Sequence, residues 1–203
     1  MARCWQPFYI AKRTQEKFLL ESLPYLKGRV LDVGCGLQPH KGYFKDYVGI
    51  DFLKYFPTVA ADARFLPFSD ASFDSVICME VLEHINNPPA VFNEIVRVLK
   101  IGGIVYITVP MYWYLHYAPL DFWRFTPYSL LGLCKSCGLL PTYLHRSGGL
   151  NHFIACRISE SLNKYLPKFL MCAVNKLLLF YTRFDKWNNR DAAGWVLRAR
   201  RNK

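Results

Sequence analysis

Two glycines and two aspartates have the types and spacing of a nucleotide site. Residues 29–36 read R-V-L-D-V-G-C-G, in which an apolar run typical of a buried strand is followed at once by Gly34 and Gly36. The glycines of a G-x-G turn allow a backbone bend that residues with a Cβ atom cannot adopt, and they let a ligand lie against the main chain. Asp32 stands near the carboxyl end of this strand, where open α/β sheets bind their ligands. A second apolar run ends in Asp51, close to the offset at which such folds place a carboxylate on ribose hydroxyls.

The turn lacks the features of a dinucleotide or phosphate site. A dinucleotide fingerprint has a third glycine, but Pro39 stands in its place, and no Gly-Lys-Ser/Thr ending follows. An acidic residue precedes the glycines and no basic residue lies among them. Such a site suits a cationic nucleoside without phosphates. S-adenosylmethionine, with its sulfonium, ammonium, ribose hydroxyls and adenine, has that character.

The elements that position these residues alternate between strand and helix. Apolar runs predict strands at 30–33, 47–51, 58–62, 73–79, 104–109, 140–147 and 194–200. Helical spacing predicts helices at 14–27, 88–99 and 128–137, the second of them ended by Gly102 and Gly103. This alternation is typical of a parallel sheet covered by helices. At 203 residues the chain can bury one core, so a single domain over 1–203 is expected.

Five motifs in this order resemble the class I S-adenosylmethionine-dependent methyltransferases, in particular the type 11 group. They are V-L-D-V-G-C-G, V-G-I-D, A-D-A-R-F-L-P-F, F-D-S-V-I-C-M-E-V-L-E-H-I and R-V-L-K-I-G-G, and the resemblance covers roughly residues 16–147. It implies an α/β fold: a Rossmann-like, seven-stranded, mostly parallel sheet with helices on both faces and an antiparallel C-terminal edge strand. It also implies S-adenosyl-L-methionine as the cofactor, with a cofactor-binding core at 28–147.

The resemblance further implies roles for individual residues. The first motif would wrap the methionine end of the cofactor, with Cys35 contributing only its backbone. Asp51 would accept hydrogen bonds from the ribose hydroxyls, and the third-strand motif would bind the adenine. The end of the fourth strand would flank the methionine portion and the acceptor. The expected cofactor-binding residues are Asp32, Gly34, Cys35, Gly36, Asp51, Phe52, Asp62, Ala63, Met79 and Glu80.

Residues 110–126 form the predicted acceptor loop. The loop is rich in aromatic residues without a clean period, and it begins where the fifth strand points its carboxyl end over the cleft. Tyr112 and Tyr114 are predicted to contact the acceptor, and Arg124 to hold an anionic group of it. His116 can take a proton from an acceptor hydroxyl. The loop also resembles an H-x-x-P-x-D-x-x-R-x-T pattern of bacterial members near surface-glycan and lipid pathways.

The same loop has a structural interpretation that stays open beside the catalytic one. Asp121 and Arg124 can form an ion pair that holds the loop, and Thr126 can cap a helix starting at Pro127. His84, about four residues past the fourth strand, is a candidate base, or it packs on or caps the following helix. The predicted catalytic residues are therefore His116, His84 and Asp121.

Two further patterns have simpler interpretations. The sequence N-P-P-A at 87–90 resembles the N-P-P-Y/F signature of methyltransferases that act on amino groups of bases and glutamine, but it lies some eight residues past the strand and lacks the aromatic. A proline that opens a helix explains it. Cys134 and Cys137 form a lone C-x-x-C without a matching second pair, which favours buried structural thiols on a helix ending at Gly138. No metal site is predicted.

The formal charge of +11 is concentrated in the last third of the chain. Residues 28–140 hold nine Lys/Arg against ten Asp/Glu, whereas 141–203 hold twelve against three. Such a tail favours anionic partners. It includes an insertion at 151–190, in which 164–186 predicts a basic amphipathic helix. This helix would attach to a membrane or anionic-lipid surface, form a homodimer contact or pack as a lid. The residues expected on its polar face are Lys168, Asn175, Lys176 and Arg183.

The favoured function is methyl transfer from S-adenosylmethionine to a small-molecule acceptor such as a lipid-linked or glycan hydroxyl. One alternative, an RNA or other nucleic-acid methyltransferase, is disfavoured by the displaced N-P-P-A and the neutral core. The other is a non-catalytic cofactor-binding or membrane-associated module. The sequence has no apolar run of transmembrane length and no signal-peptide core, and its seven scattered cysteines favour reduced thiols. A cytoplasmic protein, peripheral to the membrane if the insertion binds one, is expected.

Overall fold

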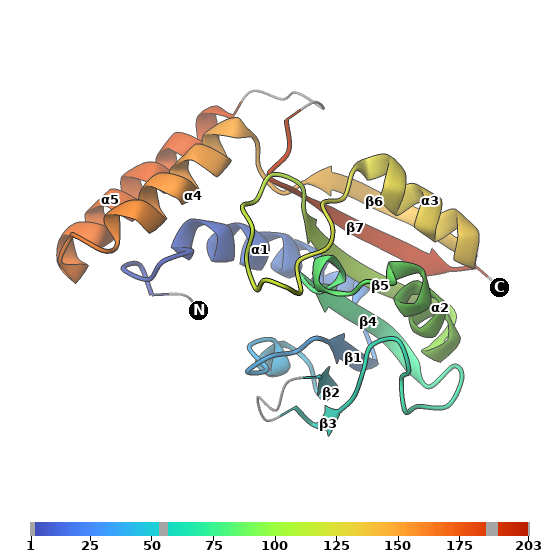
Figure 1. The fold of residues 1–203 in the computed structure, drawn as a ribbon. Coiled ribbons are helices and arrows are strands. Elements are labelled where there is room, and N and C mark those ends of the chain that lie inside the picture. The colour runs from blue at the N-terminus through green and yellow to red at the C-terminus, as the bar shows by residue number, and fades with distance from the viewer. Residues whose placement is uncertain (1–2, 53–56, 186–190, 203) are drawn as a thin grey trace.

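Seven strands form one twisted sheet in the computed structural model, which describes residues 3–52, 57–185 and 191–202 (Figure 1). The strand order is β3-β2-β1-β4-β5-β7-β6. Strands β1 to β5 pair in parallel, and β7 runs antiparallel between β5 and β6. The expected mostly parallel sheet with an antiparallel edge is confirmed. The strands are β1 (Arg29–Val33), β2 (Asp46–Asp51), β3 (Val59–Ala60), β4 (Phe73–Met79), β5 (Leu99–Pro110), β6 (Leu139–Arg146) and β7 (Gly194–Arg201).

Helices cover both faces of the sheet because successive strand side chains point to opposite faces. On one face, Phe18 and Leu19 of α1 (Tyr9–Ser22) pack against Val30 and Ile77. On the other face, α2 (Pro88–Val98) and α3 (Pro127–Cys137) pack against the neighbouring strand residues. The second core includes Leu31, Val76, Val91, Ile95, Val105 and Leu130, each completely buried. The predicted packing of the N-terminal helix on the sheet is confirmed.

The ends of two helices follow the sequence signals. Asn87 caps α2 by accepting from the backbone N–H of Ala90, and Pro88 opens the helix. Thr126 forms a capping box with Ser129 at the start of α3. The structural interpretation of Thr126 is thus confirmed, as is the proline interpretation of the N-P-P-A sequence.

The structure corrects the boundary between α2 and β5. The helix ends at Val98, and β5 starts at once with Leu99 paired to Phe73. Pairing then shifts, so that Ser75 faces Ile104, and Gly102 lies within the strand at a φ of +80°. The prediction that the two glycines end the helix was wrong, because a glycine with positive φ serves a bulged strand as well as a helix end.

Two other expected elements differ in length. The N-terminal helix starts at Tyr9 rather than at residue 14, and a short 3-10 helix, η1 (Leu23–Tyr25), follows it. The third strand is reduced to Val59 and Ala60, so that Asp62 lies in the loop beyond it. The other strand predictions agree with the structure to within one residue at most ends, β5 excepted.

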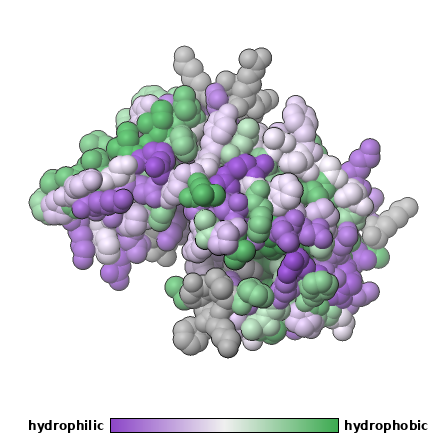
Figure 2. Space-filling view, viewed as in Figure 1, coloured by the Kyte–Doolittle hydropathy of each residue, from purple (hydrophilic) through white to green (hydrophobic). Residues whose placement is uncertain are grey.

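The insertion forms a pair of helices, α4 (Leu150–Leu162) and α5 (Lys168–Tyr181), that packs on α1 and extends away from the sheet (Figure 1). Asn175 was expected on a polar outer face but is completely buried, where it accepts from Ser159 and donates to the carbonyl of Cys4. The outer side is instead largely apolar: Phe169 is 72% exposed and Leu177 70%. Figure 2 shows apolar residues along the arm formed by α4 and α5. No helix among the described residues is long and apolar enough to cross a membrane.

A disulfide bond joins Cys4 to Cys172 of α5, 168 residues along the chain. The expectation that all thiols are reduced was therefore wrong for this pair. The five other cysteines are free, and Cys134 is buried on α3 beside the half-buried Cys137. Their interpretation as structural thiols agrees with this burial.

Candidate active site

The glycine turn after β1 and the carboxylate at the end of β2 form one unit. The backbone N–H of Gly36 donates to Asp51 Oδ2 at 2.9 Å, and the N–H groups of Gly34 and Cys35 both donate to the carbonyl of Ile50. Gly34 has a φ of +72°, and a Cβ atom there would overlap the side chain of Val81. Position 34 of the turn thus requires glycine, because the backbone there lies against the side chain of Val81, two residues past the end of β4. Burial, assisted by Asp32, raises the pKa of Cys35 to about 12, so this thiol is protonated.

Asp32 is buried within the sheet rather than open to a ligand. Its Oδ2 accepts a hydrogen bond from the hydroxyl of Tyr47 at 2.6 Å and lies 3.0 Å from Nδ1 of His40. Its side chain is 2% exposed. These contacts tie β1 to β2 and to the loop between them. Asp32 therefore shapes the turn, and its expected contact with the methionine end stays a prediction.

The residues expected around the adenine lie beyond β2 and β3. Asp62 is held by Arg64, which donates to both of its carboxylate oxygens at 2.7 to 3.2 Å and through its backbone N–H. This pairing lowers the pKa of Asp62. Ala63 is buried, whereas Phe52 is 74% exposed. The contact with the adenine that is expected of these residues stays a prediction.

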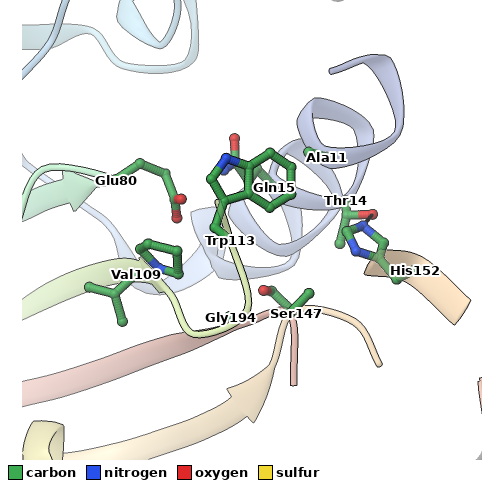
Figure 3. Close-up of a pocket in the computed structure, with 11 residues that line it drawn as sticks. Ala11, Thr14, Gln15, Glu80, Val109, Trp113, Ser147, His152 and Gly194 are labelled. Atoms are coloured by element: carbon green, nitrogen blue, oxygen red, sulfur yellow. Dashed lines mark hydrogen bonds between the residues drawn. The ribbon is translucent and has the colours of Figure 1, made fainter. Parts of the chain in front are cut away.

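Glu80 sits at the carboxyl end of β4 in a left-handed backbone conformation, with a φ of +54°. Non-glycine residues in this region are uncommon and concentrate at functional sites. Burial raises the pKa of Glu80. Together with Gln15 and Trp113, its side chain lines a cavity of about 60 Å³ between α1, the ends of β4 and β5, and α4 (Figure 3). Sequence reasoning missed Gln15, because nothing in the sequence shows that α1 crosses this end of the sheet.

A second, larger cleft adjoins that cavity. It has a volume of about 550 Å³ and lies between α1, the end of β6 and the helical arm. Both cavities are lined by Thr14, Ser147 and His152. The large cleft carries four cationic side chains and one carboxylate, which are Arg13, Lys17, Arg146, Arg183 and Asp185. Such a lining favours an anionic ligand.

The acceptor loop is bound to η3 (Leu82–His84), the 3-10 helix that follows β4. The backbone N–H of Phe122 donates to the carbonyl of Glu83 at 2.8 Å, and Nε1 of Trp123 donates to the carbonyl of Ile85 at 3.0 Å. Nδ1 of His84 lies 2.7 Å from the carbonyl of Leu120. The acceptor loop, 110–126, therefore reaches the segment that follows β4.

The three residues predicted to be catalytic meet where this loop contacts η3. The rings of His84 and His116 lie edge to face with centroids 4.7 Å apart, and Nδ1 of His116 lies 3.2 Å from Asp121 Oδ2. Arg124 donates to both carboxylate oxygens of Asp121, at 2.6 and 2.9 Å. Arg124 also donates to the carbonyls of three loop residues. The guanidinium holds the pKa of Asp121 well below its usual range, so the carboxylate stays charged and anchors the loop.

The two loop tyrosines have different surroundings. The hydroxyl of Tyr114 donates to Glu160 of α4, and the guanidinium of Arg157 lies 4.3 Å from its ring centroid. Burial, followed by the bond to Glu160, raises the pKa of Tyr114 to about 12. Tyr112 is 37% exposed and faces Phe153. Tyr114 thus connects the loop to the helical arm, and the acceptor contacts expected of both tyrosines stay predictions.

Glu83 is a residue that sequence reasoning missed. Its side chain is completely buried, and neither carboxylate oxygen has a hydrogen-bond partner. Burial, with the nearby Glu80 second, raises the pKa of Glu83 well above its ordinary value. The only available signal was its position, directly before His84 in the fourth motif.

Comparison with known proteins supports the fold. A methyltransferase-domain family matches residues 31–107, which run from β1 to β5. The strand order places the glycine turn and Asp51 where the sheet changes direction. This chain has the fold of the class I methyltransferases.

Relatives of this chain are similar to it over part of their length. An uncharacterised protein of Methanocaldococcus jannaschii is 38% identical over 90 residues, which are 39% of this chain and 40% of the relative. A ubiquinone biosynthesis O-methyltransferase of Paracidovorax citrulli is 34% identical over 113 residues, which are 44% and 47% of the two chains. The matched part thus spans less than half the length of either relative.

A solved structure extends the similarity of fold to nearly the whole chain. Phosphoethanolamine N-methyltransferase 2 of Haemonchus contortus, in complex with S-adenosyl-L-methionine, superposes with a TM-score of 0.65 at 19% identity. The alignment covers 93% of this chain and 52% of that one. At this identity the likeness concerns the fold alone.

Proposed function

We propose that this protein transfers a methyl group from S-adenosyl-L-methionine to a hydroxyl of an anionic small molecule, such as a lipid-linked intermediate or a glycan. The observation that carries the proposal is the hydrogen bond from Gly36 to Asp51 Oδ2 at the switch point of the sheet. It holds a carboxylate beside a turn whose backbone a nucleoside can approach. The S-adenosyl-L-methionine complex of the Haemonchus enzyme, which has the same fold, supports this cofactor.

The surroundings of the cleft support an anionic acceptor. The 550 Å³ cleft carries Arg13, Lys17 and Arg183, and it adjoins the cavity that Glu80 lines. A carboxylate, phosphate or pyrophosphate on the acceptor would therefore find complementary charge near the end of β4. The balanced charge of residues 28–140, nine Lys/Arg against ten Asp/Glu, does not favour a nucleic acid as the acceptor. We accordingly place the acceptor among small molecules.

The chemistry needs few residues. Methyl transfer is an in-line displacement in which the sulfonium charge disappears, so holding the acceptor oxygen collinear with the methyl group supplies much of the catalysis. An acceptor hydroxyl must also lose its proton. The imidazole of His84 in η3 and that of His116 in the acceptor loop lie side by side near the end of β4. Burial lowers the pKa of His84, which keeps its ring neutral at pH 7.

We also propose that the arm formed by α4 and α5 rests on an anionic lipid surface. Its outer side presents Phe169, Leu177 and Phe180, all more than half exposed, beside Lys168 and Lys176. Aromatic and aliphatic side chains next to lysines are the composition of interfacial helices. Sedimentation with vesicles containing phosphatidylglycerol, but not with pure phosphatidylcholine vesicles, is expected. A monodisperse dimer that does not sediment with either would assign this surface to a second copy instead.

Transfer of a labelled methyl group tests the function. The protein is incubated with methyl-labelled S-adenosylmethionine and, in parallel, with a bacterial lipid extract, a water-soluble glycan fraction and total RNA. Label is expected in the lipid or glycan fraction, and it should be lost with Asp51→Ala. Label in RNA alone would assign the acceptor to nucleic acid. The absence of label from every fraction, in a protein that binds the cofactor, would favour a non-catalytic cofactor-binding module.

A further inference from the structure

Glu83, His84 and His116 bring one carboxylate and two imidazoles to a single point between η3 and the acceptor loop. One potential ligand atom from each lies within 4.8 Å of the others, and Nε2 of His84 is 3.7 Å from Glu83 Oε1. The ligand atoms of a tetrahedral zinc ion lie about 3.5 Å apart. Closing the group onto an ion therefore needs a contraction of about an ångström, which is within the reach of side-chain rotation.

The buried carboxylate of Glu83 is the observation that points to an ion. Both of its oxygens lack a hydrogen-bond partner, although its side chain is fully buried. A buried carboxyl group without a hydrogen-bond partner is costly whether it is neutral or charged, and binding to a metal removes that cost. Arg124, a cation that acts electrostatically on Glu83, has its guanidinium committed to Asp121 and to loop carbonyls. A divalent cation would supply the missing partner.

The histidines are oriented as metal ligands are. Nδ1 of His84 lies 2.7 Å from the carbonyl oxygen of Leu120. Nδ1 of His116 lies 3.2 Å from the carbonyl oxygen of Tyr114 and 3.2 Å from Oδ2 of Asp121. A ring whose Nδ1–H donates to such acceptors presents a bare Nε2. Metal-bound histidines almost always donate their other ring N–H in this way, which fixes the tautomer and the ring orientation.

We propose that Glu83, His84 and His116 bind one divalent transition-metal ion of the zinc class. Imidazole ligands favour zinc and its neighbours over magnesium and calcium, which prefer sites made of oxygen atoms. The ion joins the acceptor loop to the end of β4, because His116 belongs to the former and Glu83 and His84 to η3. Sequence motifs for metal sites, which rely on short fixed spacings between ligands, could not have predicted this ligand set, since His116 lies 32 residues after His84.

Three protein ligands leave a further coordination position, as catalytic zinc sites do. An acceptor hydroxyl bound there would lose its proton more readily, which is the step that an oxygen acceptor needs. The residues predicted as bases would then act through the ion that they hold. This part of the inference rests on the proposed function, whereas the metal site itself does not.

Metal binding by the purified, chelator-treated full chain tests the site without any acceptor. Titration with Co²⁺ should give visible absorption bands of a low-symmetry site at one ion per chain, and Zn²⁺ should displace it. Magnesium should not bind in the same concentration range. The variants Glu83→Gln and His116→Gln should weaken Co²⁺ binding by at least about 100-fold, since even outer-shell partners of a metal site are worth about 10–100-fold.

His145→Gln is the matched control. His145 lies on β6, where its ring packs beside Tyr143 of the same strand and Phe18 of α1, and it is no part of the cluster. It should bind Co²⁺ as the wild type does. The absence of Co²⁺ or Zn²⁺ binding by the folded wild type would overturn the inference, as would unchanged binding by His116→Gln. Calorimetry with S-adenosylmethionine on the same samples separates the two proposals. Cofactor binding without metal binding would overturn the metal site alone. Metal binding without cofactor binding would overturn the proposed function alone.

Discussion

Gly36 donates its backbone N–H to Asp51 Oδ2 at 2.9 Å, so that the turn after β1 and the end of β2 form a single structural unit. The bond directs one carboxylate oxygen to the turn. Residues 15 positions apart in the chain thereby become neighbours at the point where a nucleoside would bind. Each of the two strands is paired on both sides within the sheet, which fixes the geometry of this pair.

Gly34→Ala should destabilise the protein more than Gly36→Ala. Both glycines have positive φ, but a Cβ atom at position 34 overlaps Val81, whereas one at position 36 meets nothing within 4 Å. We expect the free energy of unfolding to fall by about 3 kcal/mol for Gly34→Ala and by about 1 kcal/mol for Gly36→Ala. Urea denaturation of the three proteins measures the difference. Equal losses would contradict the close approach of this turn to the end of β4.

His152 should make stability depend on pH between about 4 and 6.5. The side chain is 5% exposed between α1 and α4, and its Nε2 lies 3.0 Å from Thr14 Oγ1. Burial lowers its pKa from 6.5 to about 4. Because the folded pKa is depressed, the stabilisation is fully present above pH 6.5 and is lost as the pH falls through 4. The loss amounts to roughly 3 kcal/mol.

The variant His152→Gln isolates this contribution. It should have a flatter dependence of the free energy of unfolding on pH in the same interval, while the carboxylates titrate alike in both proteins. The comparison of wild type and variant by urea denaturation at pH 4.5, 5.5 and 7 measures it. Parallel curves would show that His152 is not held neutral by burial.

Thr126→Ala should cost about 1 kcal/mol of unfolding free energy, because it removes the side-chain acceptor for the Ser129 N–H at the start of α3. Thr126→Ser keeps that acceptor and should cost only a few tenths of a kcal/mol. Thermal unfolding of the two variants distinguishes them. A similar loss in both would mean that the methyl group of Thr126, and not its hydroxyl, stabilises this end of the acceptor loop.

The strands and the glycine turn were predictable because their signals are local. The apolar runs that became β1, β2 and β4 lie between residues that turn the chain, and their order fixed the parallel sheet. The cap at Thr126 was likewise predictable, since a helix start needs only a few neighbouring residues. Gly102 was misassigned because its positive φ suits a bulge and a helix end equally.

The features that were missed depend on contacts between distant segments. Asn175 can be buried because Ser159 of α4 and the carbonyl of Cys4 are its hydrogen-bond partners. The pattern of apolar residues along α5 does not indicate either partner. The disulfide from Cys4 to Cys172 has no spacing signal. Glu83 looked like one polar residue of a common motif, and only the packing of the acceptor loop on η3 shows that its carboxylate is buried without a partner.

Calorimetric titration with S-adenosylmethionine tests the central claim, that the switch point of the sheet binds this cofactor. The comparison uses the wild type, Asp51→Asn and a matched control, Asp46→Asn, which changes an exposed aspartate at the other end of the same strand. We expect one site per chain, at least about tenfold weaker binding for Asp51→Asn, equivalent to about 1.4 kcal/mol, and unchanged binding for Asp46→Asn. No binding by the folded wild type, or equal binding by Asp51→Asn, would contradict the account.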